Sequence, residues 1–223
     1  MPDPAYVRTA FARIADRYVL TNHVLSCGMD LWWRRVVSQR IRGWQPKRLL
    51  DVASGTGDLA LKLQQTCPDC EVIASDFCPE MLAHASSRGV KHTLVADALA
   101  LPFPDAGFDV VTVAFGLRNM ADYPKALREM RRVLKPGGHL VILDFSLPNG
   151  ILRGPYRFYL HRVLPHLAGW LTRQQDAYEY LGGSIEAFPA GQGMLDLLAS
   201  CEFTTPDATP LTFGVVSLYT GVR

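Results

Sequence analysis

The sequence has little net charge, few cysteines and no long hydrophobic run. Its 223 residues carry 23 Lys and Arg against 21 Asp and Glu, so the overall charge gives no indication of nucleic-acid binding. No stretch of 18 apolar residues occurs, and we therefore expect no membrane-spanning helix. Five cysteines are an odd number and too sparse for a disulfide scaffold, which favours a reducing compartment. We expect a cytoplasmic protein without a nucleic-acid partner.

Other signals are also missing. Cys67 and Cys70 have the CxxC spacing, but no second pair and no histidine cluster accompany them, so we expect no metal site. The opening residues, Met1–Pro4, lack a basic segment followed by an apolar run, so we expect no signal peptide. There is no internal repeat and no low-complexity tract. The hydrophobic content of 48% instead indicates a packed globular core.

Strand-like and helix-like segments alternate from residue 48 onward. This alternation predicts an α/β fold, a doubly wound and mainly parallel sheet with helices on both faces. The predicted strands are Arg48–Val52, Glu71–Asp76, His92–Val95, Phe108–Ala114 and His139–Asp144, with a further β-rich run over Thr212–Thr220. The predicted helices are Asp58–Gln65, Pro79–Ser86, Pro124–Leu134 and Gly193–Ser200, and Lys135–Gly138 is predicted to turn the chain into the fifth strand.

Two segments stand outside this alternation, within what we expect to be one domain over residues 1–223. Residues 5–45 precede the first strand and are predicted to form an N-terminal helical cap. Residues 147–180 follow the fifth strand and are predicted to form a helical insert. Because ligands of α/β sheets bind beyond the carboxyl ends of the strands, both segments are candidate lids over a site.

A glycine loop joins the first strand to the first predicted helix. It runs from Asp51 through Ala53, Ser54, Gly55 and Gly57 to Asp58. A buried strand that enters a glycine turn and then a helix presents backbone N–H groups to a ligand. Gly55 and Gly57 permit positive φ and a close approach of the backbone to that ligand. The loop alone is compatible with NAD, FAD or S-adenosylmethionine (SAM).

The end of the second strand supplies the next candidate. Asp76 can accept hydrogen bonds from both hydroxyls of a ribose, although a turn or helix-capping role before Pro79 is the alternative. Phe77 and Met81 can flank an adenine ring, and plain core positions are the alternative for both.

The end of the third strand distinguishes between the nucleotides. Asp97 can accept a hydrogen bond from the adenine amine, and the small Ala98 leaves room for the ring. The loop also lacks the third glycine of GxGxxG, the usual provision for a pyrophosphate. Asp58 would oppose a pyrophosphate but can bind the ammonium of a methionine moiety. We therefore predict SAM as the cofactor.

The ordered motifs resemble those of known enzymes. The glycine loop, Asp76, Asp97-Ala98 and Arg132–Gly138 resemble class I SAM-dependent methyltransferases, which implies a seven-stranded Rossmann-like sheet. Other segments resemble the ubiquinone/menaquinone biosynthesis C-methyltransferase family in particular: Val7–Tyr18, Phe115–Asn119, Asp144–Ser146, Tyr180–Pro189 and Leu211–Gly221. The resemblance covers nearly the whole chain. It implies methylation of a ring carbon of a prenylated quinol, either a benzoquinol or a naphthoquinol.

The resemblance places the reacting residues after the fourth strand. Phe115 lies at the cofactor side, and Arg118 follows it. An arginine has too high a pKa to serve easily as a base, but it can hold a phenolate oxygen or orient a water. A surface or ion-paired arginine is the alternative. Asn119 can orient the same oxygen or cap the next helix.

The N-terminal cap and the insert complete the predicted site. Tyr18, Asn22 and Ser26 have helical spacing, so they can meet the quinol oxygens or bond to their own neighbours. The sequence departs from the family pattern at substrate-side positions, namely Val19, Thr21, Asp30, Leu31, Asp144, Phe213 and Tyr219.

The insert combines arginines with aromatic and aliphatic residues and has no Asp or Glu between Leu147 and Gln175. It predicts either a peripheral membrane contact that admits a prenyl tail or an ordinary lid or homodimer surface.

Three other functions remain open at this point. One is a methyltransferase of the same family that acts on another small aromatic metabolite. The second is a SAM-binding protein without catalysis. The third is an NAD-dependent oxidoreductase.

Overall fold

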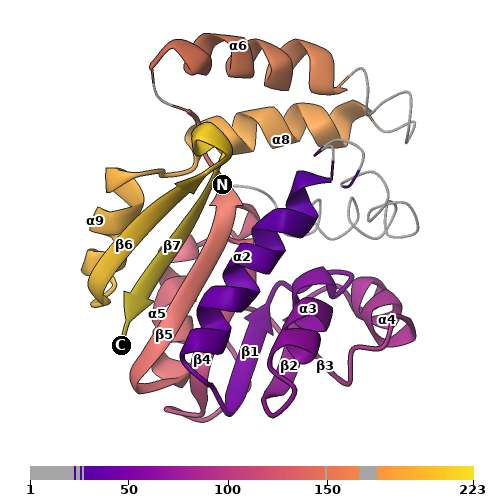
Figure 1. The fold of residues 1–223 in the computed structure, drawn as a ribbon, viewed down its shortest axis with the longest axis vertical. Helices are drawn as coiled ribbons and strands as arrows, with labels where there is room; N and C mark the ends of the chain where they lie inside the picture. Colours follow the sequence, from indigo (N-terminus) through magenta and orange to yellow (C-terminus); the bar gives the residue numbers. More distant parts are fainter. Residues whose placement is uncertain (1–22, 24–25, 27, 149, 166–174) are drawn as a thin grey trace.

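A seven-stranded sheet forms the centre of the computed structural model, which describes residues 23, 26, 28–148, 150–165 and 175–223. Its strand order is β3-β2-β1-β4-β5-β7-β6 (Figure 1). All pairs from β3 to β5 are parallel, whereas β7 is antiparallel to β5 and β6. The strands are β1 (Arg48–Val52), β2 (Glu71–Asp76), β3 (His92–Val95), β4 (Phe108–Ala114), β5 (Leu134–Phe145), β6 (Thr204–Leu211) and β7 (Val216–Val222). The predicted mainly parallel, doubly wound sheet is confirmed.

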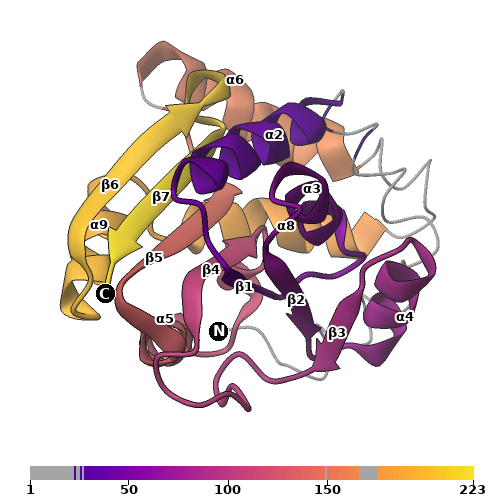
Figure 2. The ribbon, with the colours of Figure 1, turned by 60° about the horizontal axis from the view of Figure 1, so that its bottom comes forward.

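Helices cover both faces of the sheet, as its apolar strands require. On one face lie α2 (Met29–Gly43), α3 (Asp58–Thr66) and α4 (Pro79–Ser87); on the other lie α5 (Tyr123–Val133) and α9 (Gln192–Ser200) (Figures 1 and 2). Each face has its own buried cluster, with Trp33, Leu63 and Val141 on the first and Leu127, Met130 and Ile142 on the second. These two cores fix the carboxyl ends of the parallel strands along one edge.

The predicted insert is helical and lies beyond that edge (Figure 1). It contains η2 (Gly150–Leu152), α6 (Arg153–Phe158), η3 (Tyr159–Val163) and α8 (Gln175–Ala187). Leu160, Leu164 and Ile185 are buried together and join these helices to each other. The insert extends to Ala187, beyond the predicted end at residue 180. No helix within the described ranges is long and apolar enough to cross a bilayer.

Two strands differ in extent from the prediction, chiefly at their starts. β5 begins at Leu134 rather than His139, because Lys135–Gly138 bulges within the strand: Phe108 pairs with Leu134, and Val110 already pairs with His139. At the other end, Thr212–Gly214 forms the short helix η4, so β7 begins at Val216. The prediction also missed β6, a largely exposed edge strand with two prolines, because edge strands lack the apolar run of a central strand.

Gly57 marks the start of α3, and its role differs from the predicted one. Its φ is +79°, and a Cβ added there would lie 2.6 Å from Val90 Cγ2 and 3.0 Å from Ala85 Cβ. The close approach that requires glycine is therefore between α3 and the end of α4, not between the loop and a ligand. Gly55, with φ +56°, remains on the open side of the loop.

We expect Gly57→Ala to destabilise the protein more than Gly137→Ala. Gly137 has nearly the same φ, +77°, but a Cβ added there meets nothing within 4 Å. In both variants an alanine must adopt the left-handed conformation, which lowers the free energy of unfolding by about 1 kcal/mol. Only in Gly57→Ala does steric overlap lower it by about 1–3 kcal/mol more. Urea unfolding of both variants measures the difference. Equal losses of unfolding free energy would contradict this, because they would show that Val90 and Ala85 can move aside for the added methyl group without destabilising the protein.

Candidate active site

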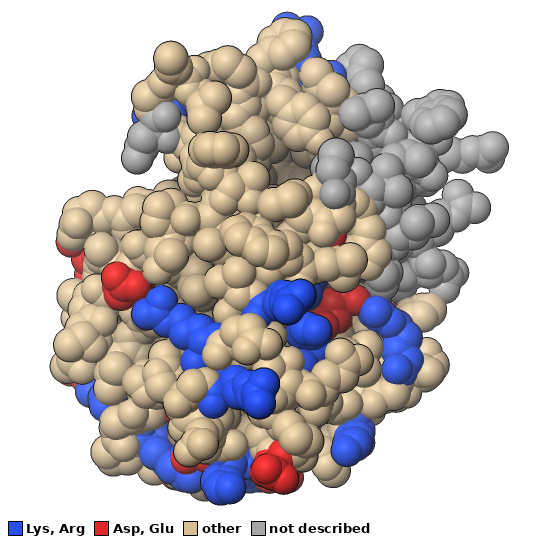
Figure 3. Space-filling model, viewed as in Figure 1, with Lys and Arg blue, Asp and Glu red and all other residues tan. Residues whose placement is uncertain are grey.

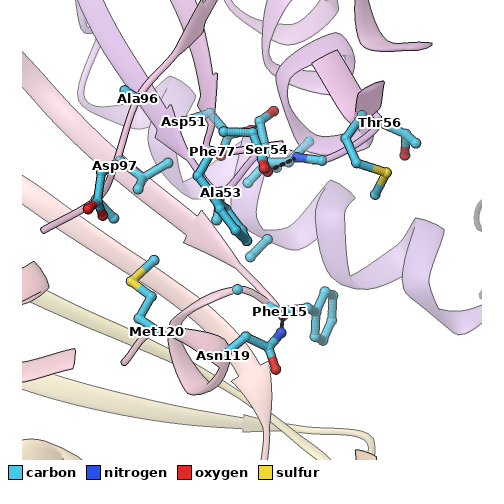
Figure 4. Close-up of a pocket in the computed structure, with 18 of the residues that line it drawn as sticks. Asp51, Ala53, Ser54, Thr56, Phe77, Ala96, Asp97, Phe115, Asn119 and Met120 are labelled. Carbon is cyan, nitrogen blue, oxygen red and sulfur yellow. Dashed lines mark hydrogen bonds between the residues drawn. The ribbon is translucent and has the colours of Figure 1, made fainter. Parts of the chain in front are cut away.

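A cavity of about 360 Å³ opens at the carboxyl ends of β1, β2 and β4. Figure 4 shows its walls, with Ser54 and Phe77 on one side and Phe115, Asn119 and Met120 on the other. Eleven of the predicted cofactor residues line it: Asp51, Ala53, Ser54, Gly55, Asp58, Asp76, Phe77, Met81, Asp97, Ala98 and Phe115. Gly57 is the exception, for the packing reason given above. Residues that the sequence analysis did not single out also line it, namely Arg34, Thr56, Leu59, Leu99 and Met120.

Asp51 fixes the loop from the side of β1. Its carboxylate accepts hydrogen bonds from the hydroxyls of Ser54 and Thr112, each at 2.6 Å. The side chain is almost completely buried, and this burial raises the pKa of Asp51 to about 6. The carboxylate is therefore a structural clamp between β1, β4 and the glycine loop.

Asp76 fixes the same loop from the side of β2. Its two carboxylate oxygens accept the backbone N–H groups of Gly55 at 2.8 Å and Cys78 at 2.9 Å. Burial raises the pKa of Asp76 even though these amide hydrogen bonds act in the opposite direction. The turn alternative is thus partly correct, since Asp76 accepts the N–H of Cys78 in the turn that precedes α4. Each carboxylate oxygen retains a second lone pair for a ligand hydroxyl.

Two residues at the strand ends have unusual backbone conformations. Ala53 after β1 has φ +51° and Phe115 after β4 has φ +59°. Between them, a Cβ on Gly116 would lie 2.6 Å from Ala53 Cβ. Left-handed residues other than glycine store strain and gather at functional sites. Here they line the floor of the cavity.

Asp97 and Ala98 form the wall beyond β3. One oxygen of Asp97 accepts the N–H of Leu99 at 2.9 Å, which holds the carboxylate at the rim. On the adjoining wall, Phe77 lines the cavity and Met81 is buried. The structure therefore brings the predicted ribose and adenine residues into one cavity.

Asp58 lies at the start of α3 and is paired with arginines. Its carboxylate lies 2.7 Å from Arg88 Nη2 and 3.8 Å from Arg34 Nη2, and it accepts the Thr56 hydroxyl at 3.1 Å. Arg34 comes from α2 and was missed, because no sequence pattern shows that α2 packs beside α3. The only available signal was the i,i+4 spacing of Asp30 and Arg34.

Asp30 corrects part of the sequence analysis. We expected its departure from the family pattern to affect the substrate side alone. Its carboxylate instead lies 2.5 Å from Nη1 of Arg34, which lines the predicted cofactor cavity, and it also accepts hydrogen bonds from Ser26 and His23, each at 2.7 Å. Burial opposes ionisation of Asp30, but the Ser26 hydrogen bond and the charges of Arg34 and His23 hold its pKa below the ordinary value.

Arg118 does not line the cavity. It is buried in an ion pair, with Nη1 2.6 Å from Asp144 Oδ1 and 2.7 Å from the Phe115 carbonyl oxygen. The ion-paired alternative therefore describes its contacts. Asn119, the next residue in η1 (Leu117–Asn119), does line the cavity, and its amide lies 3.4 Å from the same carbonyl.

The remaining predicted substrate residues lie elsewhere. Tyr18 and Asn22 fall outside the described residues. Ser26 bonds to Asp30, its neighbour along the chain. Phe213 is 85% exposed with φ +56°, a conformation that explains why glycine is usual there. This departure affects the surface and not the cavity.

The charges of the cavity indicate its ligand. Within the described residues, four carboxylates and one guanidinium line it, from Asp51, Asp58, Asp76, Asp97 and Arg34. This excess of negative charge would oppose a pyrophosphate. It suits a nucleoside with a cationic centre, hydroxyls for Asp76 and an amine for Asp97.

Comparisons with known proteins agree with this geometry. Among solved structures, a SAM-dependent methyltransferase of Thermotoga maritima, a possible histamine N-methyltransferase, shares the fold with a TM-score of 0.61 at 18% identity over 92% of this chain and 99% of that one. The fold is thus the Rossmann-like fold of that methyltransferase. The model of the ubiE/COQ5 methyltransferase family matches residues 2–223, and the chain belongs to that family.

Two relatives are similar over nearly their whole length. The chain is 49% identical to a demethylmenaquinone methyltransferase of Thermus thermophilus, over 96% of this chain and 99% of the relative. It is 42% identical to the ubiquinone/menaquinone biosynthesis C-methyltransferase UbiE of Geobacter sulfurreducens, over 97% of this chain and 88% of the relative.

We expect stability to fall with rising pH because of Asp51. Its pKa is about 6 in the folded protein against 3.8 ordinarily, so the folded state holds a proton that the unfolded state has already released. Relative to Asp51→Asn, the wild-type unfolding free energy should decrease by up to about 3 kcal/mol between about pH 4 and about pH 7. Urea unfolding of both proteins across this range measures the difference. The expectation would be contradicted if the unfolding free energy of the wild type, relative to that of Asp51→Asn, stayed constant or increased with pH.

Proposed function

We propose that this methyltransferase uses SAM to methylate a ring carbon of a reduced polyprenyl quinone in menaquinone or ubiquinone biosynthesis. The substrate is demethylmenaquinol or 2-polyprenyl-6-methoxy-benzoquinol. The observation that carries the proposal is the carboxylate-rich cavity at the sheet edge, in a chain of the ubiE/COQ5 family. The relatives named as demethylmenaquinone methyltransferases support the naphthoquinol as the first substrate to test.

The lining residues suit the parts of SAM. Asp76 would accept hydrogen bonds from the ribose hydroxyls in addition to those from the backbone N–H groups of Gly55 and Cys78. Asp97 accepts the adenine amine, and Phe77 and Met81 flank the ring. Phe115 and Asn119, which follow β4, line the remaining wall of the cavity and would face the methyl acceptor.

When bound, SAM supplies a methyl group that the nucleophilic ring carbon accepts as the carbon–sulfur bond breaks and its electron pair passes to sulfur. The protein aligns the two reactants, which can lower the barrier by on the order of 7–11 kcal/mol in favourable cases. Asn119 orients the phenolic oxygen from η1. Arg118 acts as a positioning residue, because its ion pair with Asp144 anchors η1 against the end of β5. Transfer of the phenolic proton to water activates the ring, and transfer of the ring proton to water after methylation restores aromaticity.

Labelled SAM tests the proposed reaction. We expect the protein to methylate a short-chain reduced demethylmenaquinone, to leave the oxidised quinone unmodified, and to bind SAM but not NADH in calorimetry. A catechol and a small phenol serve as other aromatic acceptors. Transfer to these without transfer to either quinol type would favour the alternative of another aromatic metabolite, and SAM binding without any transfer would favour a non-catalytic protein.

The substrate's prenyl tail requires access to a membrane. We propose that the helical insert from η2 to α8, called the lid from here on, makes that membrane contact. Half of the eight large exposed apolar side chains of the described residues lie on the lid and on η4: Ile151, Leu152, Phe158 and Phe213. The two segments adjoin, since Ser146, just before η2, donates its hydroxyl to the Gly214 carbonyl at 2.7 Å. We call these four exposed side chains, which lie on two adjoining segments, the apolar tip.

Basic residues accompany this tip. Among the described side chains, Arg157 and His161 of the lid pair with Glu186, while Arg153 and Arg162 have no carboxylate within ion-pair distance. On the face drawn in Figure 3, the described residues of the upper part of the molecule are tan and blue without red. Apolar tips beside arginines match an anionic bilayer surface better than a second copy of the same basic surface.

Sedimentation with vesicles tests the contact. The wild type should bind phosphatidylglycerol-containing vesicles more tightly than phosphatidylcholine alone, and Phe158→Ser with Phe213→Ser should weaken both by roughly tenfold or more. Leu94→Ser with Val95→Ser, exposed apolar positions on β3, is the matched control and should bind normally. Equal loss in the control, or a dimer in solution that requires Phe158 and binds no vesicles, would overturn the membrane assignment.

A further inference from the structure

Arg34 combines burial, charge and an unused hydrogen-bond donor at the wall of the cavity. It is 8% exposed and lines the cavity from α2. Its Nη1 donates to the Asp30 carboxylate and carbonyl, at 2.5 Å and 3.2 Å. Its Nε is buried and has no hydrogen-bond partner among the residues that the structure describes. A buried donor without an acceptor is costly, which indicates that an acceptor arrives with a ligand.

The surrounding charges leave room for an anion at this point. Asp58, the nearest carboxylate on α3, is already neutralised by Arg88 at 2.7 Å, and its distance to Arg34 Nη2 is 3.8 Å. The ring of Phe115 lies beneath the guanidinium, with Cζ 5.6 Å from its centroid. Asp30 and Phe115 therefore fix the plane of the guanidinium, and Nε, on the edge that it shares with Nη2, has no hydrogen-bond partner among the described residues. That edge is the one with which arginine binds carboxylates in a bidentate manner.

The cofactor proposed above has one anionic group, the carboxylate of its amino-acid end. The ribose and adenine carboxylates, Asp76 and Asp97, follow β2 and β3, so the amino-acid end extends toward the start of α3. The other charged residues lining the cavity in the described part of the chain are carboxylates, which would repel that group. We propose that Arg34 binds the α-carboxylate of SAM and that Asp58 accepts a hydrogen bond from the α-ammonium group of SAM. Asp30 positions Arg34 for this contact.

This inference rests on the SAM assignment, and its test compares ligands with and without the amino-acid end. The ligands are SAM, S-adenosylhomocysteine and 5′-methylthioadenosine, which keeps the adenosine and the thioether but lacks the amino acid. Calorimetry should show that Arg34→Met weakens binding of the first two by roughly 30-fold or more. Binding of 5′-methylthioadenosine should change by less than about twofold, because it never contacts the guanidinium.

Three variants refine the comparison. Arg35→Met alters the exposed neighbour on the same helix, which does not line the cavity, and should bind all three ligands normally. Arg34→Lys keeps the charge without the fork and should give a smaller loss, again confined to the amino-acid ligands. Asp30→Asn should weaken SAM several-fold with 5′-methylthioadenosine unchanged. Should Arg34→Met fail to fold, Arg34→Lys supplies the same comparison.

Two results would overturn the proposal. One is an equal loss of affinity for 5′-methylthioadenosine and SAM in Arg34→Met and Arg34→Lys, which would make Arg34 purely structural. The other is unchanged SAM affinity in both variants. A wild type that binds none of the three ligands would instead refute the cofactor assignment.

Discussion

Two buried carboxylates, Asp51 and Asp76, hold the glycine loop from opposite flanks, and the rest of the site depends on this clamp. Asp51 binds the hydroxyls of Ser54 and Thr112, and Asp76 binds the amides of Gly55 and Cys78. Burial raises the pKa of both acids, so part of the folding free energy maintains them. Their hydrogen bonds position the loop without any contribution from a ligand. Such preorganisation reduces the entropy that a ligand must lose on binding.

The position of a site residue relative to the strands determines whether it could be predicted from the sequence. Asp51 and Asp76 lie at the carboxyl ends of recognisable strands and Asp97 follows another, and parallel strands necessarily bring their carboxyl ends to one edge. Arg34 could not be predicted in this way, because its place in the cavity depends on how α2 packs beside α3. Arg118 was expected at the cavity, but the turn of η1 directs it toward Asp144 and leaves Asn119 at the wall. Gly57 was correctly expected to need positive φ, and only the structure shows that its partner is Val90.

The fold was predictable to a similar degree and for similar reasons. Four of the five strands predicted in the alternation (β1, β2, β4 and β5) lie inside the sheet, and their apolar runs reflect burial on both faces; the fifth, β3, was also found although it forms an edge. β6 was missed because it is polar, contains Pro206 and Pro210, and lies at the edge. The departures from the family pattern also acquire physical meaning. Asp30 supplies the countercharge of Arg34, and Phe213 belongs to an exposed tip, so neither alters the wall near Asn119.

The central claim is that the clamped loop holds SAM so that its methyl group reaches a quinol carbon. The most direct test is turnover of demethylmenaquinol with SAM labelled with carbon-13 in the methyl group, followed by NMR of the product. We predict a single labelled methyl group bonded to a ring carbon, with the chemical shift of an aryl methyl. A labelled methoxy group, or label found in no quinol product, would contradict the account.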